Sequence, residues 1–202
     1  MSIKRLLCAL AAVLLPAAAL DAALPKHSLT PEPDTLTGRV LIASSGISDP
    51  RFARTVILLI RHGKDGAFGI TINRPAGERS FQSLLEPLGD KDLEKAGGVR
   101  VFAGGPVEQQ MGFVLHSIDW EHADTLAING ELAATTSADI LRAMARGKGP
   151  RKALVVFGYA GWGPGQLEAE LARKDWLVAT ADATLVFDAP RERVWDEAMA
   201  RR

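Results

Sequence analysis

The chain has 202 residues, with 24 Lys and Arg balanced by 24 Asp and Glu, four His and one Cys. Its length suits one domain or two small ones, and a composition that is 47% hydrophobic and 24% charged excludes a disordered chain. The formal net charge of zero argues against broad nucleic-acid binding, which needs surplus cations, and the single cysteine excludes both a disulfide framework and a cysteine-based zinc site.

Residues 1–23 have the pattern of a secretory signal peptide. Lys4 and Arg5 give a positively charged start, an unbroken run of apolar residues follows, and small residues allow cleavage after Ala19 or Ala23. The apolar run is short for a membrane-spanning helix, so a retained anchor or a buried helix is the less favoured alternative. We therefore expect an exported, periplasmic protein with no stable membrane span after cleavage.

Residues 24–35 contain three prolines and few apolar side chains, which indicates an extended linker. The folded domain is therefore expected to span residues 36–202. Because Cys8 lies inside the signal peptide, the mature chain would hold no cysteine, and such a chain is indifferent to an oxidising compartment.

The domain mixes predicted strands with predicted helices. The continuous apolar run at 55–60 predicts a strand buried on both faces, and a tight turn at 63–66 predicts a hairpin to a partner strand at 67–73. Because a tight hairpin joins antiparallel strands, a purely parallel sheet is excluded. We expect an α/β (α+β) fold with a mixed, largely antiparallel β-sheet layered with helices. Further strands are predicted at 40–43, 99–103, 112–118, 126–128, 153–157, 176–180 and 184–187, and helices at 80–88, 137–146, 165–173 and 191–200.

A glycine-rich stretch, residues 158–165, connects a predicted strand to a predicted helix. This order of elements can bind phosphate through free backbone N–H groups. Three features oppose anion binding: no Lys-Ser/Thr pair follows, Pro164 lacks an N–H, and glutamates already complement the first turn of the helix. We interpret the stretch as a packed turn, in which Tyr159 and Trp162 line an apolar pocket or fill the core.

His62 and His116 lie at or near predicted strand ends and are candidates for a general base or a ligand. Neither has a His, Asp or Glu neighbour at metal-ligand spacing, so a hydrogen-bonded structural role is the default and no metal site is expected. Asn73 and Arg74 end another predicted strand, where Asn can hold a turn and Arg can bind a carboxylate or phosphate. No nucleophile elbow is present, so no catalytic residue is assigned.

Short segments from most of the domain carry a family resemblance, in the order and spacing of that family over roughly residues 36–195. They fall mainly on turns that contain glycine, proline or asparagine. The segments are 38–43, 49–52, His62, 66–69, 72–75, 104–107, 114–116, 158–162, 165–168, Glu170 and Trp176. Together they resemble the AlgH/YqgE family of bacterial proteins.

The resemblance implies an α/β fold, a mixed sheet layered with helices, and no established biochemical activity. The family's regulatory label, for alginate production or transcription, comes from the association of one member, and no DNA-binding motif here supports direct transcriptional control. Two features depart from the family pattern. Ser45 stands where the family usually has a proline, and members generally start close to the first strand and look cytoplasmic, so a cytoplasmic location is the alternative to export.

The family segments lie on loops, where binding sites are commonly built, so we expect some of them to converge on a polar cleft with an aromatic wall. The favoured function is a noncatalytic module that binds a small polar ligand or has a regulatory role. The alternatives are a hydrolase or transferase that uses His62 or His116 as general base, and a protein-interaction module. The sequence names no cofactor, and no nucleic-acid partner is expected. The candidate binding residues are His62, Asn73, Arg74, Gly104, Gly105, His116, Tyr159, Trp162 and Gln166.

Overall fold

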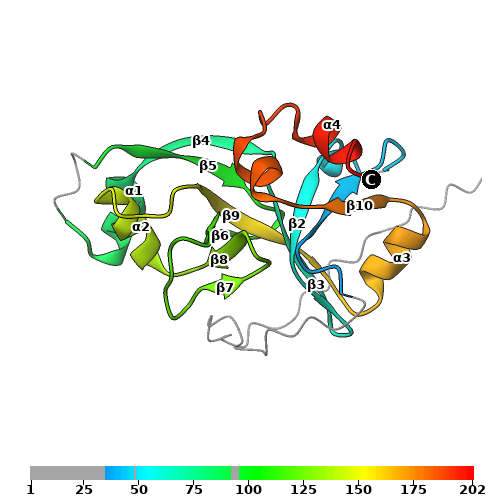
Figure 1. Ribbon diagram of the computed structural model, residues 1–202, viewed down its shortest axis with the longest axis horizontal. Coiled ribbons are helices and arrows are strands. Elements are labelled where there is room, and N and C mark those ends of the chain that lie inside the picture. The colour runs from blue at the N-terminus through cyan, green and yellow to red at the C-terminus, as the bar shows by residue number, and fades with distance from the viewer. Residues whose placement is uncertain (1–34, 48, 92–95) are drawn as a thin grey trace, which may run out of the picture.

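The computed structural model describes residues 35–47, 49–91 and 96–202 (Figure 1). The predicted signal peptide, residues 1–23, and the predicted linker up to residue 34 lie outside the described residues. At the start of the described chain, the Thr35 hydroxyl donates a hydrogen bond of 2.9 Å to the carbonyl of His62. This bond fixes the start of the domain to the end of the second strand.

Two sheets share one long strand. The strands in the described residues are β1 (Arg39–Ala43), β2 (Val56–Gly63), β3 (Gly66–Thr71), β4 (Pro75–Ser80), β5 (Gly98–Ala103), β6 (Val107–Ser117), β7 (Leu126–Ala127), β8 (Leu132–Thr135), β9 (Ala153–Trp162) and β10 (Trp176–Thr180). One sheet runs in the order β10, β1, β2, β3, β9, and the other continues from β9 through β6 and β8 to β7. β5 pairs parallel with β9, and the other strand pairs in the described chain are antiparallel, including β4 with β5. The expected mixed, largely antiparallel sheet is confirmed.

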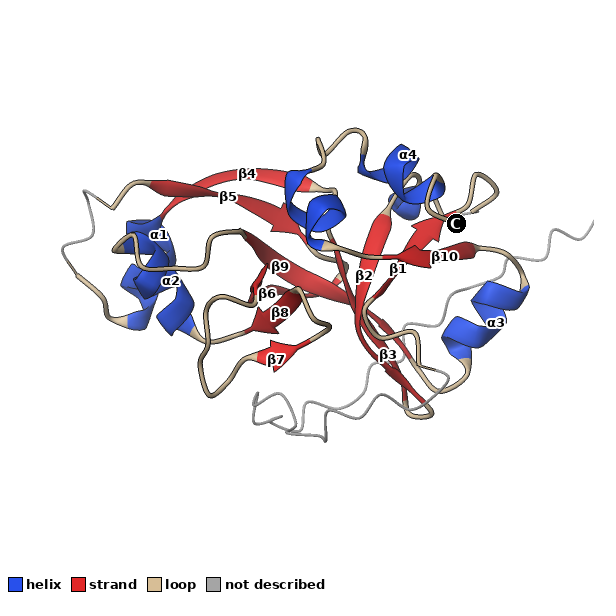
Figure 2. Cartoon of the chain, in the orientation of Figure 1, coloured by secondary structure: helices blue, strands red, loops and turns tan. Residues whose placement is uncertain are grey.

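Short helices cover the two ends of the sheets (Figure 2). The α-helices of the described chain are α1 (Phe81–Leu85), α2 (Ala138–Ala145), α3 (Gln166–Ala172) and α4 (Val194–Met199). Helices α1 and α2 pack on each other at one end, and α3 and α4 both contact β10 at the other. Two of the helices begin at serines, because Ser80 and Ser137 accept hydrogen bonds from the backbone N–H groups of Ser83 and Asp139.

Strand β9 changes partners at Gly158, where φ is 75°, a left-handed value that favours glycine. The strand pairs with β5 up to Phe157 and with β6 up to Tyr159, and from Ala160 to Trp162 it pairs with β3. The left-handed backbone at Gly158 thus lies where β9 passes from one sheet into the other, and Figure 1 shows this long strand between β3 and β6.

The predicted hairpin is confirmed. Strands β2 and β3 pair antiparallel as far as Gly63 opposite Gly66, so Lys64 and Asp65 form a two-residue connection. All residues from 56 to 60 have exposed fractions of at most 3%, which confirms a strand buried on both faces.

Two predicted elements are wrong. The predicted strand at 184–187 is a π-helical turn, Thr184–Asp188, in which the Asp182 carboxylate accepts a hydrogen bond of 2.7 Å from the N–H of Leu185. A short apolar run does not by itself distinguish a strand from a helix, and here the acidic cap favours the helical turn. The predicted packed turn at 158–165 is also wrong, because β9 continues to Trp162 and only 163–165 connects it to α3.

Strands β4 and β8 escape prediction because they lack the expected hydrophobic alternation. Every residue of β4 is exposed, and every residue of β8 is buried and two of its four residues are alanines, which favour strands weakly. Strand β6 begins at Val107 rather than at the predicted residue 112. Its first residues are largely polar and exposed, so they lack the apolar pattern that predicts a strand.

Candidate functional site

Asn73 and Arg74 hold the loop that precedes β2. The Asn73 side chain accepts a hydrogen bond of 3.0 Å from the N–H of Val56 and donates one of 2.9 Å to the carbonyl of Arg54. The Arg74 guanidinium donates to the carbonyl of Ala53 at 2.5 Å. Both side chains therefore satisfy backbone groups of a turn, as polar turn residues commonly do.

Gly104 and Gly105 lie against the backbone of β9 with no room for a side chain. A Cβ atom on Gly104 would lie 2.2 Å from the carbonyl oxygen of Gly158, and one on Gly105 would lie 2.1 Å from the carbonyl carbon of Tyr159. The N–H of Gly104 also donates a hydrogen bond of 2.7 Å to the carbonyl of Phe157. These glycines permit a close-packed crossing of two chain segments, in which neither position has space for a side chain.

Tyr159 and Trp162 face opposite sides of β9. The Tyr159 ring lies 4.7 Å from the ring centroid of Phe68, within the largest core cluster. The Trp162 ring lies 6.1 Å from that of Trp176, within a second core cluster. Because side chains alternate along a strand, residues three apart point to different faces, so these two rings do not form one aromatic wall.

His62 has both ring nitrogens engaged. The N–H of Leu36 donates to Nδ1 at 3.1 Å, so the ring proton sits on Nε2, which faces the Glu168 carboxylate at 2.9 Å. Hydrogen bonds from its own backbone N–H and from His62 lower the pKa of Glu168. In this arrangement neither nitrogen offers the free lone pair that a general base needs.

Trp162 and Gln166 meet at a third residue, Glu170. The indole N–H of Trp162 donates to Oε2 of Glu170 at 2.8 Å, and the amide of Gln166 donates to Oε1 at 3.0 Å. The Gln166 carbonyl in turn accepts a hydrogen bond of 3.1 Å from the N–H of Gly163. This network fixes the turn between β9 and α3.

His116 lies on β6 in the interior and is completely buried. Its Nδ1 is 2.9 Å from the carbonyl of Ser117, so this nitrogen carries the proton. Nε2 is buried and has no hydrogen-bond partner within the described chain, and the Trp120 ring packs edge-on with its centroid 5.5 Å away. Burial lowers the pKa of His116, which favours the neutral ring.

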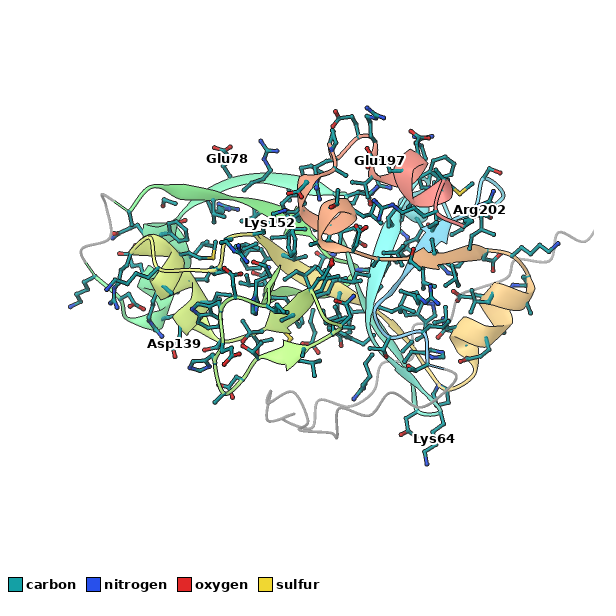
Figure 3. All side chains as sticks on the ribbon, viewed as in Figure 1. Lys64, Glu78, Asp139, Lys152, Glu197 and Arg202 are labelled. Atoms are coloured by element: carbon teal, nitrogen blue, oxygen red, sulfur yellow. The ribbon has the colours of Figure 1, made fainter. Side chains whose placement is uncertain are left out.

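A hollow of about 370 Å³ lies between the end of β6, the turn before β8 and the start of β9. Two ion pairs lie beside the hollow. Arg151 Nε lies 3.1 Å from Asp119 Oδ2. Lys152 Nζ lies 2.5 Å from the carboxylate of Asp188 in the π-helical turn. Figure 3 labels Lys152 beside that turn. The lining residues are Ser117, Ile118, Asp119, Gly130, Glu131, Arg151, Lys152 and Ala183. Such a mixture of charged, polar and apolar groups suits a small polar ligand.

Comparison with known proteins places the chain in a family. Residues 40–202 match the model of a family described as AlgH-like. The chain belongs to the AlgH-like family. A UPF0301 protein of Cereibacter sphaeroides is 45% identical to it over 161 residues, which cover 79% of this chain and 88% of that protein. A UPF0301 protein of a Jannaschia species is 48% identical over 169 residues, covering 81% and 86% of the two chains.

Solved structures share the fold of this AlgH-like chain. The solution structure of the AlgH protein from Pseudomonas aeruginosa matches with a TM-score of 0.74 and 42% identity, over 85% of this chain and 91% of that one. A crystal structure of protein DIP2367 from Corynebacterium diphtheriae matches with a TM-score of 0.63 at 22% identity, over 86% and 90% of the two chains, and shows the fold alone. Within the described ranges no helix has the length and apolar character needed to cross a membrane.

The predicted site residues of this AlgH-like chain fall into three groups. The ends of β3 and β5 meet, since Thr71 N–H donates to the carbonyl of Gly104 and Ala103 N–H donates to that of Arg74, both at 2.9 Å, and Gly104 N–H donates to Phe157 of β9. A second group lies around α3, and His116 lies apart from both on β6. None of the predicted residues lines the hollow, and their role in binding stays a prediction. The first group comprises Asn73, Arg74, Gly104, Gly105 and Tyr159; the second comprises His62, Trp162 and Gln166.

The residues of the hollow were missed by sequence reasoning. Asp119, Glu131 and Arg151 lie in charged turns and belong to no motif that indicates a site. The only signal was a set of charged residues next to predicted strand ends, at 117–119, 130–131 and 151–152. Charged turns are so common that this signal does not single out a site.

Proposed function

We propose that this AlgH-like protein is a noncatalytic module that binds a small polar ligand in the hollow between β6, the β7–β8 turn and β9. The observation that carries the proposal is the hollow itself, of about 370 Å³, lined by both acidic and basic side chains. Known small-molecule sites have volumes of roughly 300–1,000 Å³ and a few convergent polar groups.

The polar groups around the hollow are held in place before any ligand binds. Ser117 donates its hydroxyl to Asp119 and accepts a hydrogen bond of 3.1 Å from the N–H of Lys152. The Glu131 carboxylate accepts a hydrogen bond of 2.9 Å from the N–H of Ala183, which joins the turn before β8 to the π-helical turn. Groups that are already ordered lose less entropy when a ligand binds, which favours a binding role.

The alternative of a hydrolase or transferase has weaker support from the two histidines. His62 contacts a carboxylate, as a catalytic histidine often does, but its Nδ1 is taken by Leu36 N–H and its Nε2 faces Glu168. His116 is fully buried beside Trp120. Neither residue lines the hollow, so a substrate held there would not meet either ring.

A thermal-shift screen with nucleotides, sugars and carboxylic acids tests the proposal. The blocking variant is Gly130→Trp, because Gly130 lines the hollow and a Cβ atom there meets nothing within 4 Å, so we expect the chain to accept a bulky side chain that obstructs the hollow. We expect at least one compound to raise the melting temperature of the wild type and to have no effect on the variant.

Two control variants locate the binding. Gly63→Trp places an indole at an equally open position outside the hollow, and Arg74→Ala removes a predicted binding residue. Both are expected to keep the ligand-induced shift. The proposal is contradicted if no compound raises the melting temperature. It is also contradicted if the ligand-induced shift is lost in Arg74→Ala but kept in Gly130→Trp.

A further inference from the structure

Arg151 presents a cationic edge to the hollow. Its Nε atom and its backbone N–H both lie 3.1 Å from Oδ2 of Asp119, and its side chain is 83% exposed. The two terminal Nη atoms have no hydrogen-bond partner among the described residues. A guanidinium that is anchored by one edge and open at the other is the geometry that binds carboxylates through paired N–H groups.

Asp119 holds the Arg151 guanidinium in this orientation because its carboxyl group stays ionised. The hydroxyl of Ser117 donates to Asp119 and lowers the pKa of its carboxyl, and the backbone and side chain of Arg151 add to the effect. The negative charge therefore persists at neutral pH and holds the guanidinium. Arg151 is thereby arranged before a ligand arrives.

Glu131 presents the opposite charge from the turn before β8. Its Oε2 accepts a hydrogen bond from Ala183 N–H at 2.9 Å, and Oε1 has no partner in the described part of the chain. The turn itself is fixed, because the side-chain oxygen of Asn129 accepts hydrogen bonds of 2.9 Å from the N–H groups of both Glu131 and Leu132. One carboxylate oxygen is therefore held at the hollow and free to accept a hydrogen bond from an ammonium group.

The other cation at the hollow, Lys152, has its ammonium 2.5 Å from the carboxylate of Asp188. Arg151 is bonded to Asp119 through Nε alone among its side-chain nitrogens, and Glu131 to Ala183 through Oε2 alone, so each keeps a charged edge for a ligand at the hollow. Ile118, which is 48% exposed, adds an apolar surface to the same lining. A ligand that satisfies all three must carry one anionic and one cationic group and a small apolar part.

We propose that the hollow binds a small amino-carboxylate zwitterion, an α-amino acid or a short peptide, with its carboxylate on Arg151 and its ammonium on Glu131. The inference rests on the proposed function and names the ligand class for the same hollow. Each terminal charge would gain a charge-assisted hydrogen bond, and a side chain of the ligand would cover Ile118.

Calorimetric titration of the full domain with L-alanyl-L-alanine tests this ligand class. Two analogues each remove one charge: N-acetyl-L-alanyl-L-alanine lacks the ammonium, and L-alanyl-L-alaninamide lacks the carboxylate. Both are expected to bind more weakly than the dipeptide, by up to about fivefold, since an ion pair between exposed groups contributes up to about 1 kcal/mol.

Two variants assign each charge to its side chain. Glu131→Gln keeps an oxygen that can accept from Ala183 N–H, and Arg151→Gln keeps the backbone bond to Asp119, so both folds are expected to persist. Glu131→Gln should lose the preference for the dipeptide over the acetylated analogue, and Arg151→Gln should lose the preference over the amide. Exposed charges elsewhere serve as matched controls, Glu192→Gln and Lys148→Gln, and both should keep both preferences.

The outcomes separate the ligand class from the proposed function. If the dipeptide and free amino acids fail to bind while another compound binds in a manner that Gly130→Trp abolishes, the zwitterion inference is overturned and the binding module stands. If no compound binds at all, both are overturned. Dipeptide binding in which both variants keep both preferences also overturns the assignment to Arg151 and Glu131.

Discussion

Trp162 and Trp176 donate their indole N–H groups to the same oxygen atom, Oε2 of Glu170, each at 2.8 Å. The two rings cross edge to face at 82°, one from β9 and the other from β10. Both indoles are at most 8% exposed. One carboxylate on α3 therefore joins two strands at opposite edges of the first sheet.

Loss of this carboxylate is expected to destabilise the domain. Glu170→Ala leaves two buried indole donors without partners, and each such loss costs about 1–3 kcal/mol, so we expect the free energy of unfolding to fall by about 2–6 kcal/mol. Urea denaturation followed by circular dichroism measures the change. A loss below 0.5 kcal/mol, the scale of an ordinary surface substitution, would show that the indole bonds contribute little.

A paired substitution tests the same network by rescue. Glu170→Gln can still accept from the indoles, but its amide group then faces the amide of Gln166, which also donates. Adding Gln166→Glu restores a donor opposite an acceptor and still accepts from Gly163 N–H. We expect the double variant to be more stable than Glu170→Gln alone. If instead the two substitutions lower the free energy of unfolding additively, Gln166 does not donate to residue 170 as proposed.

The stability of the domain should fall as the pH falls below neutrality, and His116 should be one cause. Burial lowers the pKa of His116, so the unfolded chain binds a proton near the ordinary value of 6.5 while the folded chain does not. This contribution to stability is present above pH 6.5 and is lost below it, by at most about 1.4 kcal/mol per pH unit.

The slope of stability against pH is read from denaturation curves at several pH values between 7.5 and 5. His116→Leu should flatten the slope whatever it does to absolute stability. The control is His122→Leu, which removes a ring paired with Asp139 and should keep the part of the slope that comes from His116. An unchanged slope in His116→Leu would show that the buried ring takes up a proton as readily as an exposed one.

The crossing at Gly104 should not tolerate a methyl group. In Gly104→Ala the new Cβ atom would lie 2.2 Å from the Gly158 carbonyl oxygen, so the strands must separate, and a loss of about 3 kcal/mol or a failure to fold is expected. The control is Gly63→Ala, where a Cβ atom meets nothing within 4 Å and stability should change by about 0.5 kcal/mol or less. Equal melting temperatures for the two variants would contradict the close crossing.

We propose that residues 1–23 direct export, and expression of the full chain in a Gram-negative host tests this. The mature protein is expected in the periplasm with Leu20 or Leu24 as its first residue. Deletion of residues 2–23 should leave the protein in the cytosol. Full-length protein in the cytosolic fraction of cells that express the whole chain would refute the export signal.

The sequence predicted those parts of the fold that depend on interactions between residues close in the sequence. The turn at 63–66 predicted the hairpin, and the helices predicted to start at residues 80 and 137 do begin there, each capped by a serine. The course of β9 depends instead on distant contacts: its residues 158–162 look like a loop, and only the approach of Gly104 and Gly105 shows why so many glycines are needed in a strand.

The candidate site was less predictable, because its residues come from turns far apart in the sequence. Arg151 and Glu131 are ordinary turn residues until the fold sets them beside one hollow. Asn73 and Arg74, which look like ligand-binding groups in the sequence, instead satisfy backbone carbonyl and N–H groups of the neighbouring loop. Side-chain type alone does not separate these two uses.

Amide chemical-shift mapping of the labelled domain, during titration with a compound that stabilises it, shows where the ligand binds. If a small polar ligand occupies the hollow, the shifts concentrate at Ile118, Gly130, Lys152 and Ala183, and Gly130→Trp abolishes them. Shifts that concentrate instead around Arg74 and Gly104 would show that the ligand does not bind in the hollow.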